Sequence, residues 1–246
     1  MKKNYLWTKL KARLEFIRVE RGENYNWLFL PGGPGLGSES LNKLTQILYL
    51  PGIIWHLDLP GDGSNLITDD GQYFSHWFET LLEAVGALEN VILVAHSTGG
   101  MYALATPGLE KKLVGLILMD SAPNSTWQQK FMEYVKKHPL AEVERWQKIY
   151  AENPNNEALK KLTLASSPYL FTTEGLKKDI SFLETLPINY KACEWSALNF
   201  DNTYEKAGKC EARAAEPAVA ASSGVKSLAK PIVGGDRTAA AEGNTV

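Results

Sequence analysis

Short apolar segments alternate with helix-forming segments in the first half of the chain, and this alternation restricts the possible folds more than any other feature. The candidate strands are LEFIRVE (14–20), WLFLP (27–31), IIWHLDL (53–59), VILVA (91–95) and VGLILMD (114–120). The last three are apolar almost throughout, as in parallel sheets whose two faces are covered by helices. Apolar residues also recur at helical spacing over 77–88. The pattern predicts an α/β fold with a mostly parallel central sheet flanked by helices.

The composition divides the chain into three regions. Residues 1–124 carry the strand and helix pattern and are interpreted as the core. Residues 125–200 contain charged, aromatic-rich helical segments with no strong strand between them. We interpret them as a helical cap lying over the sheet. Residues 201–246 form an atypical tail.

The tail differs from the rest of the chain in its side chains. All 25 aromatic residues lie before residue 205. Alanine occurs 11 times in residues 205–246, against 13 times in the much longer region before them. A segment rich in Ala, Gly, Ser and Lys buries little apolar surface. The composition predicts a disordered tail, with a remnant of strand character only in KPIVGGD (230–236).

Charge and composition exclude several classes of protein. The net charge of −2 gives no electrostatic footprint for nucleic acid. The basic N-terminus lacks the apolar core of a signal peptide, and no apolar run has the ~20 residues of a membrane helix. Cys193 and Cys210 have no metal-ligand spacing, which fits a reducing compartment. The sequence predicts a cytoplasmic protein with no metal or organic cofactor, and no nucleic-acid or membrane partner.

The most informative motif is AHSTG (95–99), directly after the strand expected at 91–95. It matches the G-x-S-x-G nucleophile elbow, with alanine in the first position. In this elbow the serine occupies a strained turn between a strand and a helix, so its neighbours must be small. Pro107 marks the end of the helix that follows. Ser97 is the candidate nucleophile, and a purely structural strand-to-helix turn is the alternative.

A glycine-rich loop, LPGGPG (30–35), follows the strand expected at 27–31. Its spacing fails the phosphate-loop and dinucleotide patterns, which argues against a nucleotide-binding module. Backbone N–H groups of such a loop can stabilise the oxyanion of acyl transfer. Pro34 has no N–H, so Gly33 is the expected donor, paired with the N–H of Thr98. A simple glycine turn is the alternative.

Taken together, these motifs resemble the α/β-hydrolase family, in its serine-nucleophile branch. The resemblance rests on PGGPG, DLPGDG (58–63), AHSTGG and MDSAP (119–123) in this order, and it covers about residues 14–200. PGGPG is most similar to the HGGPG loop of proline iminopeptidases and their relatives, with Pro31 in place of the histidine. The resemblance implies hydrolysis of an ester or amide bond of a small molecule.

The resemblance also implies a histidine base after the last strand, and this chain has none there. Its four histidines are His56, His76, His96 and His138. His56 lies within a strand and His76 opens a helix. His96 precedes the serine but is expected to point away from it across the turn. His138, at the end of a helix, is the one candidate for a replacement base. Without a base in reach, serine is a poor nucleophile.

Two aspartates are candidates for the acid that the resemblance implies. Asp236 follows the strand-like segment of the tail and matches the family's acid position. Asp120, at the end of the strand expected at 114–120, is the alternative.

Two hypotheses follow for the function. The first is a serine hydrolase of esters or amides, impaired by the missing histidine. The second is a non-catalytic binding or vestigial protein on the same scaffold. Since the C-terminal part of the family pattern is lost or replaced, an inner strand should become a bare sheet edge, and we expect self-association through it.

Overall fold

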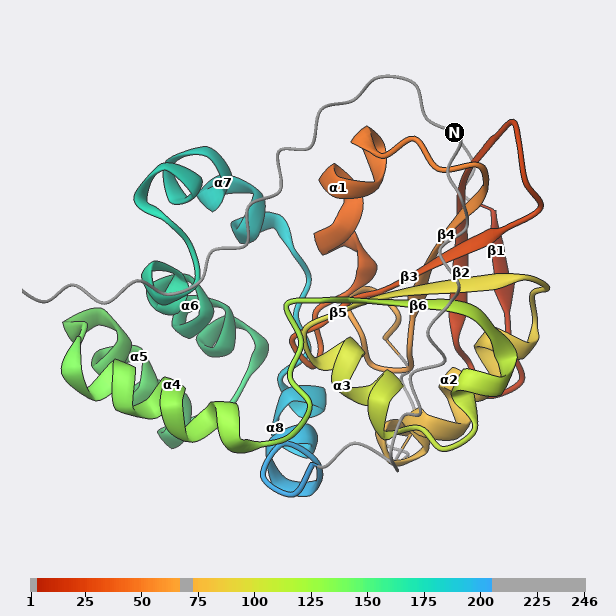
Figure 1. Ribbon diagram of the computed structural model, residues 1–246. Coiled ribbons are helices and arrows are strands. Elements are labelled where there is room, and N and C mark those ends of the chain that lie inside the picture. The colour runs from red at the N-terminus through yellow and green to blue at the C-terminus, as the bar shows by residue number, and fades with distance from the viewer. Residues whose placement is uncertain (1–3, 67–72, 205–246) are drawn as a thin grey trace, which may run out of the picture. The chain divides into compact units, whose positions relative to one another are not determined.

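The computed structural model describes residues 4–66 and 73–204, and within them six strands form a single sheet in the order β1-β2-β4-β3-β5-β6 (Figure 1). The strands are β1 (Tyr5–Trp7), β2 (Arg13–Glu20), β3 (Asn26–Leu30), β4 (Gly52–Asp58), β5 (Val91–His96) and β6 (Leu113–Met119). β3 pairs in parallel with β4 and β5, and β5 pairs in parallel with β6. β1 and β2 are antiparallel additions at the other edge. The predicted α/β class with a mostly parallel sheet is confirmed.

The five strands expected from the sequence begin and end within one residue of their predicted bounds. β1 was not predicted. It has three residues, of which only the middle one is half-buried, so it shows neither an apolar run nor a clear alternation.

The described ranges contain eight α-helices. They are α1 (Asn42–Ile47), α2 (Trp77–Gly86), α3 (Thr98–Ala105), α4 (Thr126–Lys137), α5 (Ala141–Glu152), α6 (Asn156–Ser166), α7 (Thr173–Thr185) and α8 (Tyr190–Asn199). None of the helices in these ranges combines the length and the apolar composition needed to cross a bilayer. The segment 126–185 is helical throughout except for short connections, as its sequence predicts.

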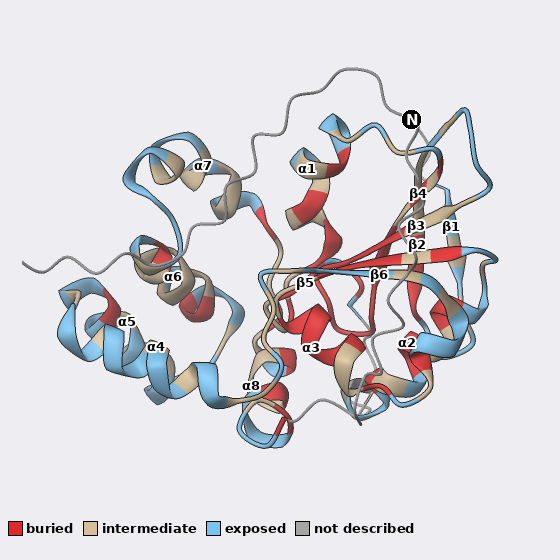
Figure 2. Ribbon diagram, viewed as in Figure 1, coloured by how far each residue is buried: buried red, intermediate tan, exposed pale blue. Residues whose placement is uncertain are grey.

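The core lies on both faces of the sheet (Figure 2). Alternate residues of a strand point to opposite faces, so Leu28 and Leu30 enter one cluster while Phe29 enters the other. The larger cluster contains Trp77 of α2 and Tyr102 of α3, whose rings meet edge to face at 4.7 Å. α2 and α3 therefore cover one face, and the smaller cluster forms beside Leu41 on the other.

α8 falls within the range interpreted as a cap, yet its side chains belong to the larger core cluster. Ala192 is fully buried there, and Trp195 packs against the Trp77 ring at 5.4 Å. Phe200 and Tyr204, which follow the helix, join the same cluster. The described chain thus returns to the core after the helices α4 to α7.

β6 differs from its sequence-based expectation. Its apolar run predicts a strand covered on both faces, but Val114, Leu116, Ile117 and Leu118 are 36–57% exposed. The prediction of full burial is wrong because, among the described elements, β6 is the last strand of the sheet and has a neighbour only in β5. Residues 205–246 of the atypical tail, with the strand remnant at 230–236 and Asp236, lie outside the described residues.

Candidate active site

Ser97 occupies a sharp turn between β5 and α3. Its backbone angles are φ 50° and ψ −121°, a conformation that few non-glycine residues adopt. The Ser97 N–H donates to the carbonyl of Met119 at 2.8 Å, and the Ser121 hydroxyl donates to the Ser97 carbonyl at 2.8 Å. The turn is therefore fixed from the end of β6, as a strained conformation requires. Among the described residues, the Ser97 hydroxyl itself has no hydrogen-bond partner.

The glycine-rich loop lies directly against this turn. A Cβ added at Gly32 would stand 2.5 Å from the Ser97 Cβ and 2.5 Å from the His96 carbonyl oxygen. Such distances are far inside van der Waals contact, so only glycine fits at this position. Gly33 is the next residue of the loop, and its Cα therefore lies within about 8 Å of the Ser97 Cβ. Gly99 has the matching role in α3, because a Cβ there would collide with the Pro31 carbonyl.

Two backbone N–H groups near Ser97 have no partner among the residues that the structure describes. Within the described parts of the chain, no hydrogen bond takes up the N–H of Gly33 or of Thr98. Gly33 has φ 61°, and its carbonyl accepts from the N–H of Leu36 at 2.8 Å, which closes a tight turn. Thr98 is the first residue of α3, where N–H groups have no partner within the helix. Both donors are thus available to a negatively charged oxygen.

The loop is held from behind by buried carboxylates. Asp62 accepts from the Gly35 N–H at 3.3 Å, and Asp58 accepts from the Ser38 N–H at 2.6 Å. Asp58 is fully buried and pairs with Arg13, whose Nη2 and Nε lie 2.8 and 3.2 Å from its Oδ2. Burial raises the pKa of Asp58, and the Arg13 guanidinium opposes this shift. These contacts fix both ends of the segment from Gly35 to Ser38.

Asn189, directly before α8, also holds the loop in place through hydrogen bonds. The Asn189 N–H donates to the Gly35 carbonyl at 3.0 Å, and its side-chain amide donates to the Gly61 carbonyl at 3.0 Å. The Gly63 N–H also donates to the Gly35 carbonyl, at 3.1 Å. These hydrogen bonds therefore fix the backbone of the loop on three sides.

Asp62 gives the stability of the chain a characteristic pH dependence. Burial raises the pKa of Asp62 well above its usual value, and the nearby Asp58 raises it further. A carboxyl with a raised pKa in the folded state binds protons more tightly there, so its contribution to stability decreases as the pH rises. Asp62→Asn removes this titration and keeps an oxygen acceptor for Gly35.

We therefore expect the free energy of unfolding of Asp62→Asn, minus that of the unchanged chain, to increase by about 1 kcal/mol or more between about pH 4 and neutral pH. Urea unfolding at several pH values measures this difference. A difference that stays flat for Asp62→Asn would contradict this account of Asp62.

A cavity of about 10 Å³ lies between the loop and α3, close to the volume that one water molecule needs. Gly32, Asp62, Thr98 and Tyr102 are among its lining residues. Burial raises the pKa of the Tyr102 phenol far above its usual value, so this group remains protonated. A larger cavity, of about 440 Å³, opens between Gly63–Leu66 and the N-terminal end of α6.

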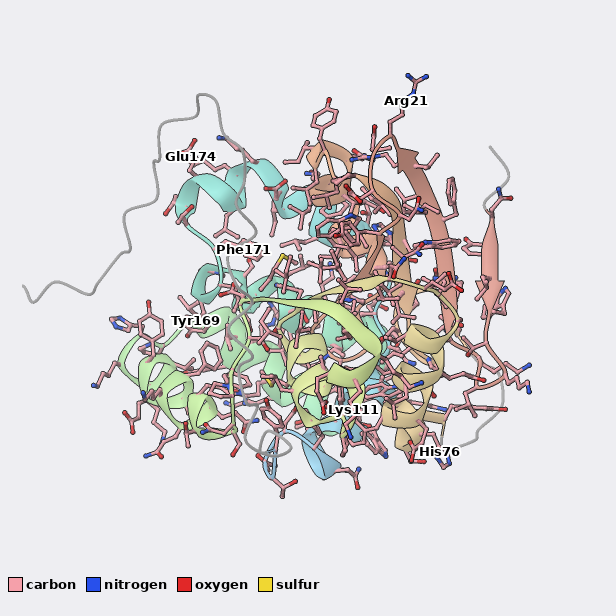
Figure 3. The ribbon with its side chains drawn as sticks, turned by 45° about the vertical axis from the view of Figure 1, so that its right-hand side comes forward. Arg21, His76, Lys111, Tyr169, Phe171 and Glu174 are labelled. Carbon is pink, nitrogen blue, oxygen red and sulfur yellow. The ribbon has the colours of Figure 1, made fainter. Side chains whose placement is uncertain are left out.

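Three of the histidines lie away from Ser97. The His56 ring is buried in β4 and shares a hydrogen bond of 2.9 Å with the Thr45 hydroxyl. His76 projects from the start of α2, with 64% of its side chain exposed (Figure 3). His138 ends α4, where its exposed ring packs on Tyr134 at 4.5 Å. None of these contacts brings a ring nitrogen to the candidate nucleophile.

His96 is adjacent to Ser97 in the chain and interacts electrostatically with Asp120. Burial lowers the pKa of His96, and the negative charge of Asp120 opposes this shift. Asp120 follows β6 with φ 52°, a left-handed conformation that aspartate tolerates better than most residues. The sequence indicated Asp120 only as a substitute acid, and its proximity to His96 was not predicted.

The cluster of Arg13, Asp58, Asp62 and Asn189 was also not identified as functional from the sequence. The motif DLPGDG could have indicated the cluster. It places two aspartates at the end of an apolar strand, and buried carboxylates need hydrogen-bonding or charged partners. Arg13 and Asn189 are 45 and 128 residues away from the groups they contact, so no local pattern could reveal them.

Comparison with known proteins agrees with the fold. A family model described as the alpha/beta hydrolase family matches residues 27–198. Comparison with curated proteins gives no match.

Solved structures resemble the chain in fold. A proline iminopeptidase-related protein from Thermus thermophilus is 20% identical with a TM-score of 0.51, over 80% of this chain and 72% of that one. A carboxylesterase from Nitrososphaera gargenis is 13% identical with a TM-score of 0.55, over 82% and 73%. An N-formylmaleamic acid deformylase from Pseudomonas putida is 16% identical with a TM-score of 0.50, over 83% and 74%.

Proposed function

Because the chain belongs to the alpha/beta hydrolase family, we propose that it is a serine hydrolase that attacks the carbonyl carbon of a small ester or amide, with Ser97 as nucleophile. One observation carries the proposal. Ser97 stands at a strained turn directly against Gly32, beside two N–H groups that no described residue uses. A purely structural turn would need neither the strain nor the unused donors.

The proposed reaction follows from this arrangement. The Ser97 oxygen attacks the carbonyl carbon, and the carbonyl oxygen takes up the negative charge. The N–H groups of Gly33 and Thr98 stabilise this oxyanion, while Pro34 has no N–H to offer. The acyl group is transferred to Ser97, the alcohol or amine leaves, and water then releases the acid. Two structural neighbours support the ester or amide class by their names, a proline iminopeptidase-related protein and a carboxylesterase.

The proposed enzyme is impaired at one step. Ser97 must lose a proton as it attacks, and no histidine ring forms a hydrogen bond with its hydroxyl among the described residues. The remaining residues, 1–3, 67–72 and 205–246, contain no histidine. We keep Asp236 as the proposed acid, with Asp120 as its alternative. A non-catalytic binding or vestigial protein is the second candidate function, favoured by the same missing base.

We further propose that the helices between β6 and α8, within residues 125–200, act as the cap of the active site. Lys43 of α1 forms an ion pair with Asp179 of α7, and Leu36 of the loop makes a β-bridge with Ile188. These contacts support a helical segment that meets the core beside the oxyanion loop. The net charge and the cysteine spacing support our proposal of a cytoplasmic protein.

Covalent labelling tests the nucleophile. We expect a fluorophosphonate probe to modify the folded chain at Ser97, slowly because no base assists, and peptide mapping by mass spectrometry identifies the site. Ser97→Ala should abolish the adduct. Ser125→Ala, a change at another half-buried serine outside the site, should leave it unchanged. Equal labelling of many serines, or the same pattern in urea, would refute a nucleophile positioned by the fold.

A further inference from the structure

Gly35 is the residue at which two distant segments of the chain meet the glycine-rich loop. Its carbonyl accepts from the Asn189 N–H at 3.0 Å and from the Gly63 N–H at 3.1 Å. Its own N–H donates to Asp62 at 3.3 Å. A Cβ at this residue would lie 2.3 Å from the Asn189 carbonyl oxygen, so the close approach of Asn189 requires glycine here. The position of Gly35 therefore depends on the segment before α8.

The side chain of Asn189 joins the same segments to α8. Its Nδ2 donates to the Gly61 carbonyl at 3.0 Å. Its Oδ1 accepts from the Lys191 N–H at 3.1 Å, which caps the N-terminus of α8. Asn189 is only 9% exposed, and a buried amide whose donor and acceptor are both used is held in one orientation. Asn189 therefore fixes α8, the turn at Gly61 and Gly35 relative to one another.

The segment before α8 also restrains the turn that carries the Gly33 N–H. The Leu36 N–H donates to the Gly33 carbonyl at 2.8 Å and closes this turn. Leu36 makes a β-bridge with Ile188, the residue before Asn189. Pro34 follows Gly33 directly, and its ring fixes its own φ. The turn therefore has little freedom of its own, and a shift of Asn189 would shift the N–H of Gly33.

α8 is bonded as well to the helix that carries the second donor. Ser196 of α8 is fully buried, and its hydroxyl donates to Asp201 at 2.9 Å and lies 3.1 Å from the Tyr102 hydroxyl. Because the single proton of the Ser196 hydroxyl is used, Tyr102 is the donor in the second hydrogen bond. Tyr102 belongs to α3, which begins at Thr98 (Figure 1). α8 therefore holds both the loop of Gly33 and the helix of Thr98.

From these contacts we infer that Asn189 is a positioning residue of the oxyanion site, whose bonds to Gly35 and Gly61 hold the Gly33 N–H where it can share one substrate oxygen with the Thr98 N–H. Asn189 acts through the loop and not on the substrate. The inference rests on the proposed function, because it assigns a role in that reaction. Loss of one oxyanion donor slows a reaction about 10²–10³-fold, and a misplacement of about 1 Å can cost about 100-fold. Loss of the Nδ2 bond should therefore slow the attack of Ser97.

Two substitutions of Asn189 share only one change, the loss of the Nδ2 donor. Asn189→Ser keeps the charge of the site and an oxygen that can cap α8, whereas Asn189→Asp keeps the volume and the capping oxygen. Asn155 offers matched controls, because it caps α6 through the Ala158 N–H and its Nδ2 donates to the nearby Asn153 carbonyl. Asn155→Ser and Asn155→Asp therefore remove an equivalent bond outside the oxyanion site.

Fluorophosphonate labelling of Ser97 in the full chain, at a series of probe concentrations, gives the maximal rate and the concentration that produces half of it. Both Asn189 variants should lower the maximal rate at least about fivefold, because the donors act on the oxygen in the transition state. The half-saturating concentration should change less than about twofold. Both Asn155 variants should keep the maximal rate within about twofold, since their lost bond lies outside the site. Hydrogen exchange of peptides covering residues 32–38 should be faster in the Asn189 variants alone, and circular dichroism confirms the fold of each variant.

Several results would overturn the inference. One is a loss of less than about fivefold in either Asn189 variant while the unchanged chain labels at Ser97, and this result leaves the proposed function standing. Others are an equal loss in the Asn155 variants, a change confined to the half-saturating concentration, and slow labelling without faster exchange of the loop. Failure of the unchanged chain to label at Ser97 would instead remove the proposed function, and the inference with it.

Discussion

Turnover of p-nitrophenyl acetate by this chain is expected to be at least about 1,000-fold slower than turnover by an intact proline iminopeptidase-like hydrolase. Removing one member of a serine triad, with the oxyanion donors left in place, has effects of this order. Among the described residues, the N–H groups of Gly33 and Thr98 have no hydrogen-bond partner, and no histidine ring forms a hydrogen bond with the Ser97 hydroxyl. Initial rates of both proteins, measured in the same buffer and at the same pH, give the ratio.

The histidines provide the controls for this expectation. His138→Ala and His76→Ala should leave the small rate of the chain unchanged, because both rings are exposed and make their contacts elsewhere. A rate within tenfold of the intact relative would mean that a base reaches Ser97 after all. His138 would then be the first residue to replace, since it lies in the segment proposed as the cap.

The second large effect concerns stability. Arg13→Met should lower the free energy of unfolding by about 3–5 kcal/mol, because it leaves the Asp58 carboxylate buried without its cation. Arg13 also donates to the Ser64 hydroxyl at 2.8 Å, and only 9% of its side chain is exposed. Methionine keeps most of the volume, so the effect reports the charge and the hydrogen bonds. Urea unfolding monitored by tryptophan fluorescence measures it.

An exposed ion pair supplies the comparison. Arg145→Met removes the partner of Glu142 at 3.6 Å on α5, where both side chains are more than 60% exposed. Its effect should stay below about 1 kcal/mol. Adding Asp58→Asn to Arg13→Met should recover part of the loss, because the buried charge is then removed. A loss below 1 kcal/mol for Arg13→Met would show that Asp58 is not held by this pair.

The sequence predicted the fold where the signal was local. Apolar runs gave five strands, and small residues around Ser97 gave the turn, because strand burial and turn strain each act on a few consecutive residues. β1 was not predicted because a three-residue edge strand is too short to show a periodic pattern of apolar residues. The exposure of β6 was not predicted, because burial depends on which elements lie beside a strand. An apolar run in the sequence does not contain this information.

The closeness of the two candidate motifs was predictable in the same sense. Ser97, Gly33 and Thr98 come from two motifs that each follow a parallel strand, and the carboxyl ends of such strands meet at one edge of the sheet. The support behind the loop was not predictable. Asn189 reaches Gly35 across more than a hundred residues, and Arg13 reaches Asp58 from the antiparallel strand β2.

The most direct test of the central claim compares the residual hydrolysis of p-nitrophenyl acetate by the chain with that by Ser97→Ala. The two proteins differ by one oxygen atom at a half-buried position, so the fold and its other nucleophiles are the same. If Ser97 is the nucleophile beside the oxyanion donors, the chain turns over slowly but measurably, and Ser97→Ala falls to the rate of buffer alone. If both proteins hydrolyse the ester at the same rate above buffer, Ser97 does not carry the chemistry and the account is contradicted.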